Sequence, residues 1–92
     1  MKFYYVYILR SLRDERFYAG FSENLRRRID DHNSGKNAST KYRRPLELVF
    51  YEAFLNKADA MKRERYFKTT KGKAVLKSML IHFLQTKTKH NY

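Results

Sequence analysis

The stretch FYYVYILRSLRDERFYAGF, residues 3–21, decides the fold of this chain. Its first seven residues are all aromatic or aliphatic, which is typical of a strand that is covered on both faces. Residues 11–15 are polar and suit a turn, and a second short apolar run follows over residues 16–21. This spacing predicts a β-hairpin whose strands span residues 3–9 and 16–21.

The rest of the chain predicts helices and one further strand. Ser22 or Asn24 can cap a helix that runs to about residue 33, where Gly35 ends it. The elements expected after it are a basic loop over 36–44, a strand over 46–53, a helix from 56 to about 70, a break at 71–73 and a third helix over 75–84. The order β-β-α-β-α-α predicts an α+β fold with a small three-stranded, mainly antiparallel sheet flanked by helices.

Length and composition limit the class of protein. Ninety-two residues allow one domain with a small core, which we expect over residues 1–84, with a flexible C-terminal tail over 85–92. The chain has no cysteine and no apolar run of the ~18 residues that a membrane span needs. Disulfide frameworks and thiolate metal sites are thereby excluded, and a reducing, cytoplasmic location is expected.

Charge is the strongest global signal in the sequence. Lysine and arginine number 21 and aspartate and glutamate 9, which gives a formal net charge of +12. This exceeds the roughly 2 to 8 charges that solubility requires in a small domain. A polyanionic partner is expected, with nucleic acid favoured over an anionic membrane surface. The apolar stripe of the third helix, on which a membrane role would depend, fits a helix that faces a core.

Two ionisable residues on the first helix share a face with apolar ones. Arg28 and His32 lie on the same helical stripe as Leu25 and Ile29. The two arginines before Arg28 each have an aspartate four residues on, whereas Arg28 has none. Arg28 is therefore either an edge residue that extends to water or a planar cation that faces an anion. His32 is either a polar residue at the core edge or a proton carrier near neutral pH.

Glu64 is a second charge in an unexpected place. Three of its four helical neighbours are apolar, so its carboxylate lies beside the buried stripe of a strongly basic segment, residues 57–73. One interpretation is a helical ion pair with Lys68. The other is a metal ligand, because Mg²⁺ often binds through one or two carboxylates, several waters and a substrate phosphate.

The hairpin tyrosines also have two interpretations. If the strands pair, Tyr7 and Tyr18 project to the same face of the sheet. They are then either core residues or platforms on which bases stack. Gly20 is expected to let the chain turn just after Tyr18.

Taken together, these residues resemble the GIY-YIG nuclease domain, and especially its small stand-alone bacterial members. The resemblance rests on Tyr5-Val6-Tyr7, on Tyr18-Ala19-Gly20, on Arg28 ten residues after Tyr18 and on a helical Glu64. The segments LRRRIDDHNSG, KYRRPLELVFYE and AMKRERYFK also resemble that family, and the similarity covers residues 3–80. Tyr5, Val6 and Ala19 replace the Gly, Ile and Ile of the motif names, at packing positions where little chemical effect is expected.

The resemblance implies an endonuclease that hydrolyses phosphodiester bonds of DNA with Mg²⁺ or Mn²⁺, in DNA repair or processing. It implies that Tyr7 orients and deprotonates a water and that Tyr18 positions water or phosphate. Arg28 would bind the scissile phosphate and Glu64 would hold the cation. His32 would assist proton transfer or hydrogen-bond a phosphate. Neighbouring positive charge is expected to lower the pKa of Tyr7 from its usual ~10. RNA stays open as a substrate, and the oligomeric state is not indicated.

Nucleic acid is expected to be bound mainly by electrostatic contacts with its phosphates. Candidate phosphate contacts are Ser22, Asn24, Lys36, Lys41, Arg44 and Lys68, each of which also fits a solvated surface residue. Binding is expected to be weak, sensitive to salt and largely independent of sequence. The alternative function is a non-catalytic nucleic-acid-binding module, which would need the basic loop and the sheet aromatics but not an inward Arg28 and Glu64.

Overall fold

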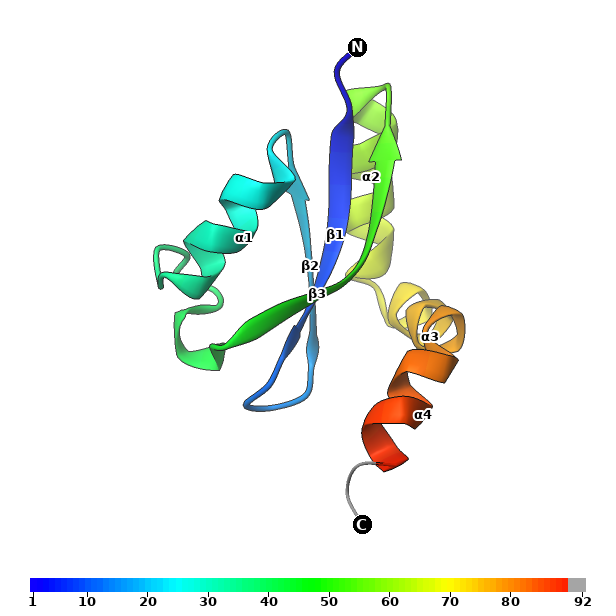
Figure 1. Ribbon diagram of the computed structural model, residues 1–92. Helices are drawn as coiled ribbons and strands as arrows, with labels where there is room; N and C mark the ends of the chain where they lie inside the picture. Colours follow the sequence, from blue (N-terminus) through cyan, green and yellow to red (C-terminus); the bar gives the residue numbers. More distant parts are fainter. Residues whose placement is uncertain (90–92) are drawn as a thin grey trace.

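The computed structural model describes residues 1–89 and has the expected α+β fold (Figure 1). Its single sheet is antiparallel with the order β2-β1-β3, in which β1 spans Tyr4–Ser11, β2 Phe17–Ser22 and β3 Leu46–Phe54. The predicted hairpin is confirmed, with strand limits that differ from the expected ones by one or two residues. β1 lies at the centre of the sheet, which explains why its sequence is apolar on both faces.

Four helices flank the sheet. They are α1 (Leu25–Asn33), α2 (Lys57–Phe67), α3 (Thr70–Met79) and α4 (Ile81–Lys89), and a short 3-10 turn spans Lys41–Arg43. Figure 1 shows α1 on one side of the sheet and the other three helices on the opposite side. Asn24 and Asn56 cap α1 and α2 with side-chain oxygens that accept backbone N–H groups of the first turn. Gly35, just after α1, has a φ of 82°, which favours glycine.

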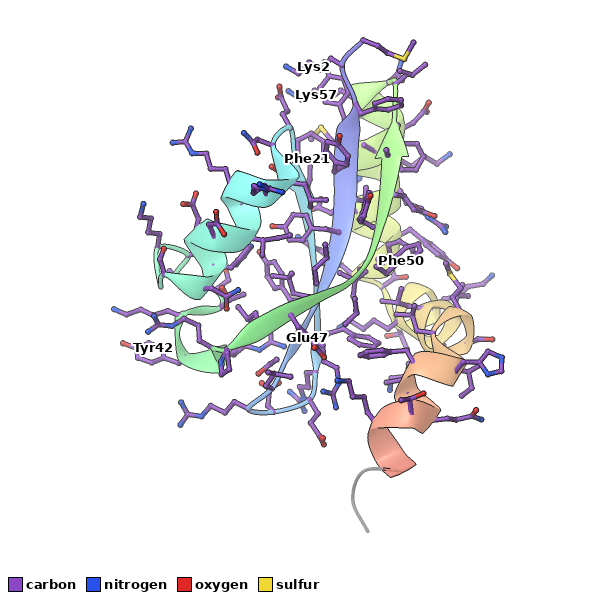
Figure 2. The ribbon with its side chains drawn as sticks, in the orientation of Figure 1. Lys2, Phe21, Tyr42, Glu47, Phe50 and Lys57 are labelled. Atoms are coloured by element: carbon purple, nitrogen blue, oxygen red, sulfur yellow. The ribbon has the colours of Figure 1, made fainter. Side chains whose placement is uncertain are left out.

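The alternation of side chains along β1 divides the core between the two faces of the sheet. Val6 and Ile8 face α2 and α3, whereas Tyr7 and Leu9 face α1. Phe50 of β3 joins the first cluster on the α2 and α3 side (Figure 2). The tyrosine expected to be catalytic therefore lies on the face covered by α1.

The start of α3 corrects the expected break at residues 71–73. These residues form the first turn of α3, where the Thr69 hydroxyl accepts the Gly72 N–H at 3.0 Å. A Cβ on Gly72 would overlap the carbonyl oxygen of Tyr66. The glycine is therefore needed because α3 approaches the end of α2 closely, and α2 ends at Phe67 rather than near Thr70.

The C-terminal part of the chain differs from expectation as well. The single helix expected over 75–84 is divided, because α3 ends at Met79 and α4 begins at Ile81. The tail expected to be flexible from Gln85 is helical over residues 85–89, which continue α4; the rest of that tail lies outside the described residues, and the expected flexibility stays a prediction. Within residues 1–89 no helix has the length and apolarity to cross a bilayer.

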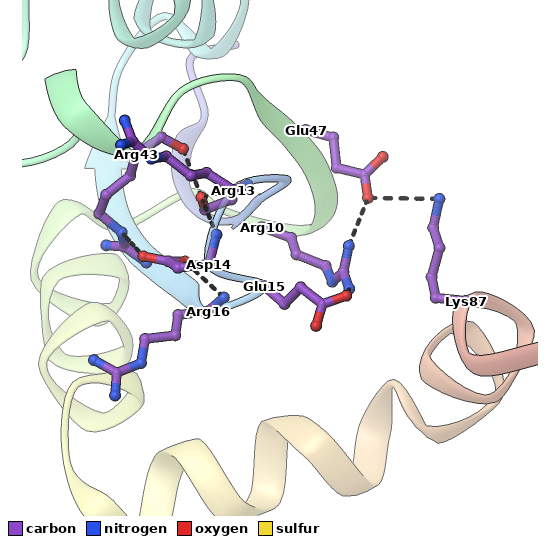
Figure 3. A network of polar contacts seen from close by, with 9 residues as sticks. Arg10, Arg13, Asp14, Glu15, Arg16, Arg43, Glu47 and Lys87 are labelled. Atoms are coloured by element: carbon purple, nitrogen blue, oxygen red, sulfur yellow. Dashed lines mark hydrogen bonds and ion pairs between the residues drawn. The ribbon is translucent and has the colours of Figure 1, made fainter. Parts of the chain in front are cut away.

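An ion network links α4 to the hairpin end of the sheet (Figure 3). The Arg10 side chain is only 9% exposed; its Nη2 donates to Oε1 of Glu15 at 3.1 Å, and its Nη1 lies 3.9 Å from Oε1 of Glu47. Lys87 of α4 places its Nζ 3.7 Å from the same Glu47 oxygen. A buried guanidinium needs such partners, and sharing Glu47 holds α4 beside the sheet.

Candidate active site

A buried histidine joins the two hairpin tyrosines. His32 of α1 is fully buried, and its Nε2 lies 2.8 Å from the hydroxyl oxygen of Tyr7. Its ring is edge-on to that of Tyr18, with ring centroids 5.1 Å apart. The structure thus brings together Tyr7, Tyr18 and His32, on the sheet face that the alternation along the strands predicted.

The second ring nitrogen of His32 contacts a residue that the sequence analysis missed. Its Nδ1 lies 2.7 Å from Oγ1 of Thr40, which is fully buried as well. Thr40 belongs to the segment that was expected to be a solvated basic loop, and a threonine there gave no signal of its own. It reaches His32 only because this segment folds back under α1 before β3 begins.

Two neutral tautomers of His32 satisfy both hydrogen bonds, because one ring nitrogen donates while the other accepts. In one of them Nδ1–H donates to Thr40 and Nε2 accepts the Tyr7 O–H. In the other, both directions are reversed. The bonds therefore couple the direction of the Tyr7 hydrogen bond to the one at Thr40.

Gly20 has a packing role in this site rather than the expected role in a turn. It lies inside β2, directly opposite Tyr7 in the strand register. A Cβ on Gly20 would be 2.8 Å from Cε1 of Tyr7 and closer still to the Tyr7 hydroxyl. Only glycine leaves room for the Tyr7 ring to cross β2 and reach His32.

The pKa values of the buried pair move in opposite directions. Burial raises the pKa of Tyr7 far above 10, Tyr18 and Glu64 raise it further, and Arg28 opposes them. The positive charge of Arg28 lowers this pKa as expected, but burial outweighs it, so the pKa of Tyr7 is raised and not lowered. Burial and Arg28 lower the pKa of His32 below 6.5, against a smaller opposite effect of Asp31. At pH 7 the phenol is thus protonated and the imidazole neutral.

Arg28 is exposed and lines a hollow of about 360 Å³ at the start of α1. Two of the predicted phosphate contacts line the same hollow. The buried Ser22 hydroxyl donates to the Asn24 carbonyl at 2.8 Å and accepts the Asn24 N–H at 2.9 Å, and Asn24 caps α1. Both residues therefore shape the turn that presents Arg28, and their contact with phosphate stays a prediction.

Glu64 of α2 is a carboxylate whose negative charge raises the pKa of Tyr7. Its side chain is 19% exposed, and Oε2 lies 3.0 Å from Nζ of Lys68, so the helical ion pair is formed. In the part of the chain that the structure describes, no group of three or more His, Cys, Asp or Glu side chains could hold a metal ion. A single hard oxygen donor fits Mg²⁺ or Mn²⁺ when water and a substrate phosphate supply the other ligands.

Of the other four predicted phosphate contacts, Lys68 lies at the end of α2 and the remaining three lie on the segment between α1 and β3. The Lys36 Nζ is 3.7 Å from Oδ1 of Asp31, the Lys41 Nζ lies over the Tyr42 ring, and the Arg44 Nε donates to the Lys41 carbonyl at 2.8 Å. None of the three lines the hollow that contains Arg28. They stay predictions for a more distant part of a bound strand.

Comparison with known proteins identifies a matching family and several similar proteins. Residues 3–78 match the family described as GIY-YIG catalytic domain. A UPF0213 protein of Lactiplantibacillus plantarum is 41% identical over 85 residues, covering 89% of this chain and 83% of the relative. A UPF0213 protein of Staphylococcus haemolyticus is 44% identical over 75 residues, covering 80% and 90%. The solution NMR structure of a UPF0213 protein from Bacillus halodurans has a TM-score of 0.53 at 39% identity, over 84% of each chain.

Proposed function

Because the chain belongs to the GIY-YIG catalytic domain family, whose members are generally nucleases, we propose that it is a divalent-metal-dependent endonuclease that hydrolyses phosphodiester bonds of DNA. The resemblance predicted from the sequence, to this family and to its small bacterial members, is confirmed. The observation that carries the proposal is the buried chain of contacts from Tyr7 through His32 to Thr40. A part in DNA repair or processing and a cytoplasmic location stay predictions from the sequence.

In this proposal Tyr7 relays a proton to His32. Attack on a phosphodiester needs a water that loses a proton, and a buried, protonated phenol is a poor base by itself. The Tyr7 oxygen accepts a hydrogen bond from the water while its O–H donates to Nε2 of neutral His32. As the water proton passes to Tyr7, the Tyr7 proton passes to His32, so no free phenolate forms.

The other site residues bind and orient the substrate. Arg28 binds the scissile phosphate with its planar guanidinium and stabilises the charge that develops there. The Tyr18 hydroxyl positions the water or a phosphate oxygen. Glu64 would hold one Mg²⁺ or Mn²⁺, and a bound cation of this kind supplies charge stabilisation at the phosphate and the leaving oxygen.

The activity is tested by incubating the purified chain with supercoiled plasmid and Mg²⁺ or Mn²⁺, with a chelator as the control. Nicking that requires the divalent cation is the expected result, and labelled single-stranded DNA, duplex DNA and RNA then define the substrate. The alternative is a non-catalytic nucleic-acid-binding module, with which the net charge of +12 is equally compatible. Tight binding with no nicking under either cation would establish that alternative.

Thr40 is expected to position His32 for this reaction. Thr40→Val removes the acceptor of the Nδ1–H bond and favours the tautomer whose Nε2–H donates to Tyr7, which blocks the relay. We expect cleavage to slow by about 10-fold or more, as for other residues that orient a functional imidazole. Thr40→Ser keeps the hydroxyl and should retain most of the rate.

The tautomer of His32 provides a readout that does not depend on cleavage. In ¹⁵N NMR spectra the wild type and Thr40→Ser should carry the His32 proton on Nδ1, and Thr40→Val should show loss of this preference. Equal rates and the same tautomer in all three proteins would show that Thr40 has only a packing role.

A further inference from the structure

A basic track runs along the free edge of the sheet, beside the candidate active site. Among the described residues β2 pairs with β1 alone and so forms an edge of the sheet, where the Arg43 Nη2 donates to the Phe17 carbonyl at 3.5 Å. At its start lies a hollow of about 220 Å³, of which Tyr18 forms one wall and Arg43, Lys68 and Lys73 form the charged lining. Tyr18 also contacts His32, so this hollow and the candidate active site share one residue.

A second hollow extends the track away from the site. It has a volume of about 410 Å³, shares Phe17 and Lys73 with the first hollow, and adds Arg16 and Lys77. The one carboxylate that lines either hollow is Glu15, and this carboxylate accepts a hydrogen bond from the buried Arg10 (Figure 3). The lining of the track is therefore strongly positive.

The hollow at the other end of β2 differs in charge. It is the hollow that contains Arg28, and its two arginines, Arg27 and Arg28, lie with two carboxylates, Glu23 and Asp31. These carboxylates are themselves paired with Lys2, Lys57 and Lys36. A polyanion that binds at Arg28 therefore meets carboxylates within that hollow, whereas no carboxylate lines the hollow formed by Arg43, Lys68 and Lys73.

Lys73 is the cation of the first hollow that has no counter-charge. Lys68 is paired with Glu64 at 3.0 Å, and the Arg43 Nε lies 3.1 Å from Oδ2 of Asp14 (Figure 3). Lys73 forms no ion pair with any side chain that the structure describes, and it lies where the two hollows meet. Its ammonium group is free to bind an anion.

We propose that this track binds the phosphate backbone of the nucleic-acid strand on one side of the scissile bond, with Lys73 as its main anchor. The position of the scissile bond rests on the proposed nuclease function. Successive phosphates fit the track because cations of the start of β2, of the segment before β3, of the end of α2 and of α3 line its two adjoining hollows. The apolar floor of Phe17, Phe67 and Leu76 suits the sugars between them.

The test compares Lys73→Ala with Lys71→Ala, which removes the same charge from an exposed position of α3 that lines neither hollow. Binding to a fluorescent DNA duplex is measured by anisotropy in a chelator over a range of salt. Lys73→Ala should weaken binding about threefold or more relative to Lys71→Ala, and the slope of log affinity against log salt should fall by about one unit. Equal losses in the two variants would overturn the proposal, since only total charge would then matter.

The absence of cysteine allows a second measurement on the same two positions. Lys73→Cys and Lys71→Cys each carry a single thiol to which a short photo-crosslinker is attached. Crosslinking to bound DNA from position 73 and much less from position 71 is expected, and the reverse order would contradict the track. Both measurements need no cleavage, so a chain that binds through Lys73 and never nicks would refute the nuclease function while supporting the track.

Discussion

A Glu64→Gln variant is expected to cleave DNA about 10²-fold or more slowly than the wild type. Glutamine keeps the size of the side chain and can still accept a hydrogen bond from Lys68, but it lacks the negative charge that attracts a divalent cation. No group of three or more His, Cys, Asp or Glu side chains within residues 1–89 could hold the cation in its place. The measurement is the single-turnover rate at saturating DNA over a range of Mg²⁺ concentration.

Asp59→Asn is the matched control for this variant. Asp59 is an exposed carboxylate in the first turn of the same helix, five residues before Glu64, and it is not proposed as a metal ligand. Its loss should change the rate by no more than about twofold, consistent with the small effect of an exposed charge. If Glu64→Gln cleaves as fast as this control at every Mg²⁺ concentration, the assignment of Glu64 as the metal ligand is wrong.

Tyr7→Phe is the second change with a large expected effect, a loss of about 10²-fold or more in cleavage rate. The phenylalanine ring can still cross Gly20, but it lacks the hydroxyl that lies 2.8 Å from Nε2 of His32. The relay between water and His32 is thereby broken. Tyr51→Phe, which removes an exposed hydroxyl from the far edge strand, should leave the rate unchanged. Thermal unfolding of both variants shows whether the buried change has destabilised the fold.

The same relay predicts how cleavage depends on pH. His32 accepts the Tyr7 proton only when it is neutral, and burial together with Arg28 holds its pKa below 6.5. The rate should therefore rise as pH increases through this pKa and level off near neutrality, while Tyr7, whose pKa lies above 10, stays protonated. The residual activity of Tyr7→Phe should lack this rise. A wild-type profile whose midpoint lies above 6.5 would contradict the role of a neutral His32.

Much of the fold follows from local patterns in the sequence. The hairpin, the Asn24 and Asn56 caps and the shared face of Tyr7 and Tyr18 each depend on neighbouring residues or on the two-residue repeat of a strand. These are the features that chemistry and spacing along the chain determine directly. They were sufficient to place the tyrosines, the arginine and the histidine near one another.

The features that could not be predicted from the sequence depend on how segments far apart along the chain approach each other. Thr40 becomes part of the site only when its loop folds back onto His32. Gly72 lies in the first turn of α3, which comes so close to the Tyr66 carbonyl that a Cβ would overlap it. The pKa of Tyr7 depends on a balance between burial and Arg28, and only the depth of the packed site shows that burial is the larger effect. Gly20 likewise acts through a ring that comes from another strand.

The central claim is that Arg28, Glu64 and the Tyr7–His32 pair form one nuclease site, and one comparison tests it most directly. Metal-dependent plasmid nicking is measured for the wild type, Arg28→Ala and Arg26→Ala. Both variants remove one exposed positive charge from α1, but of the two residues only Arg28 lines the hollow beside the site. Arg28→Ala should nick about 10²-fold more slowly than the wild type, and Arg26→Ala should remain within a few-fold. Equal rates for Arg28→Ala and Arg26→Ala, or no metal-dependent nicking by the wild type, would contradict the account.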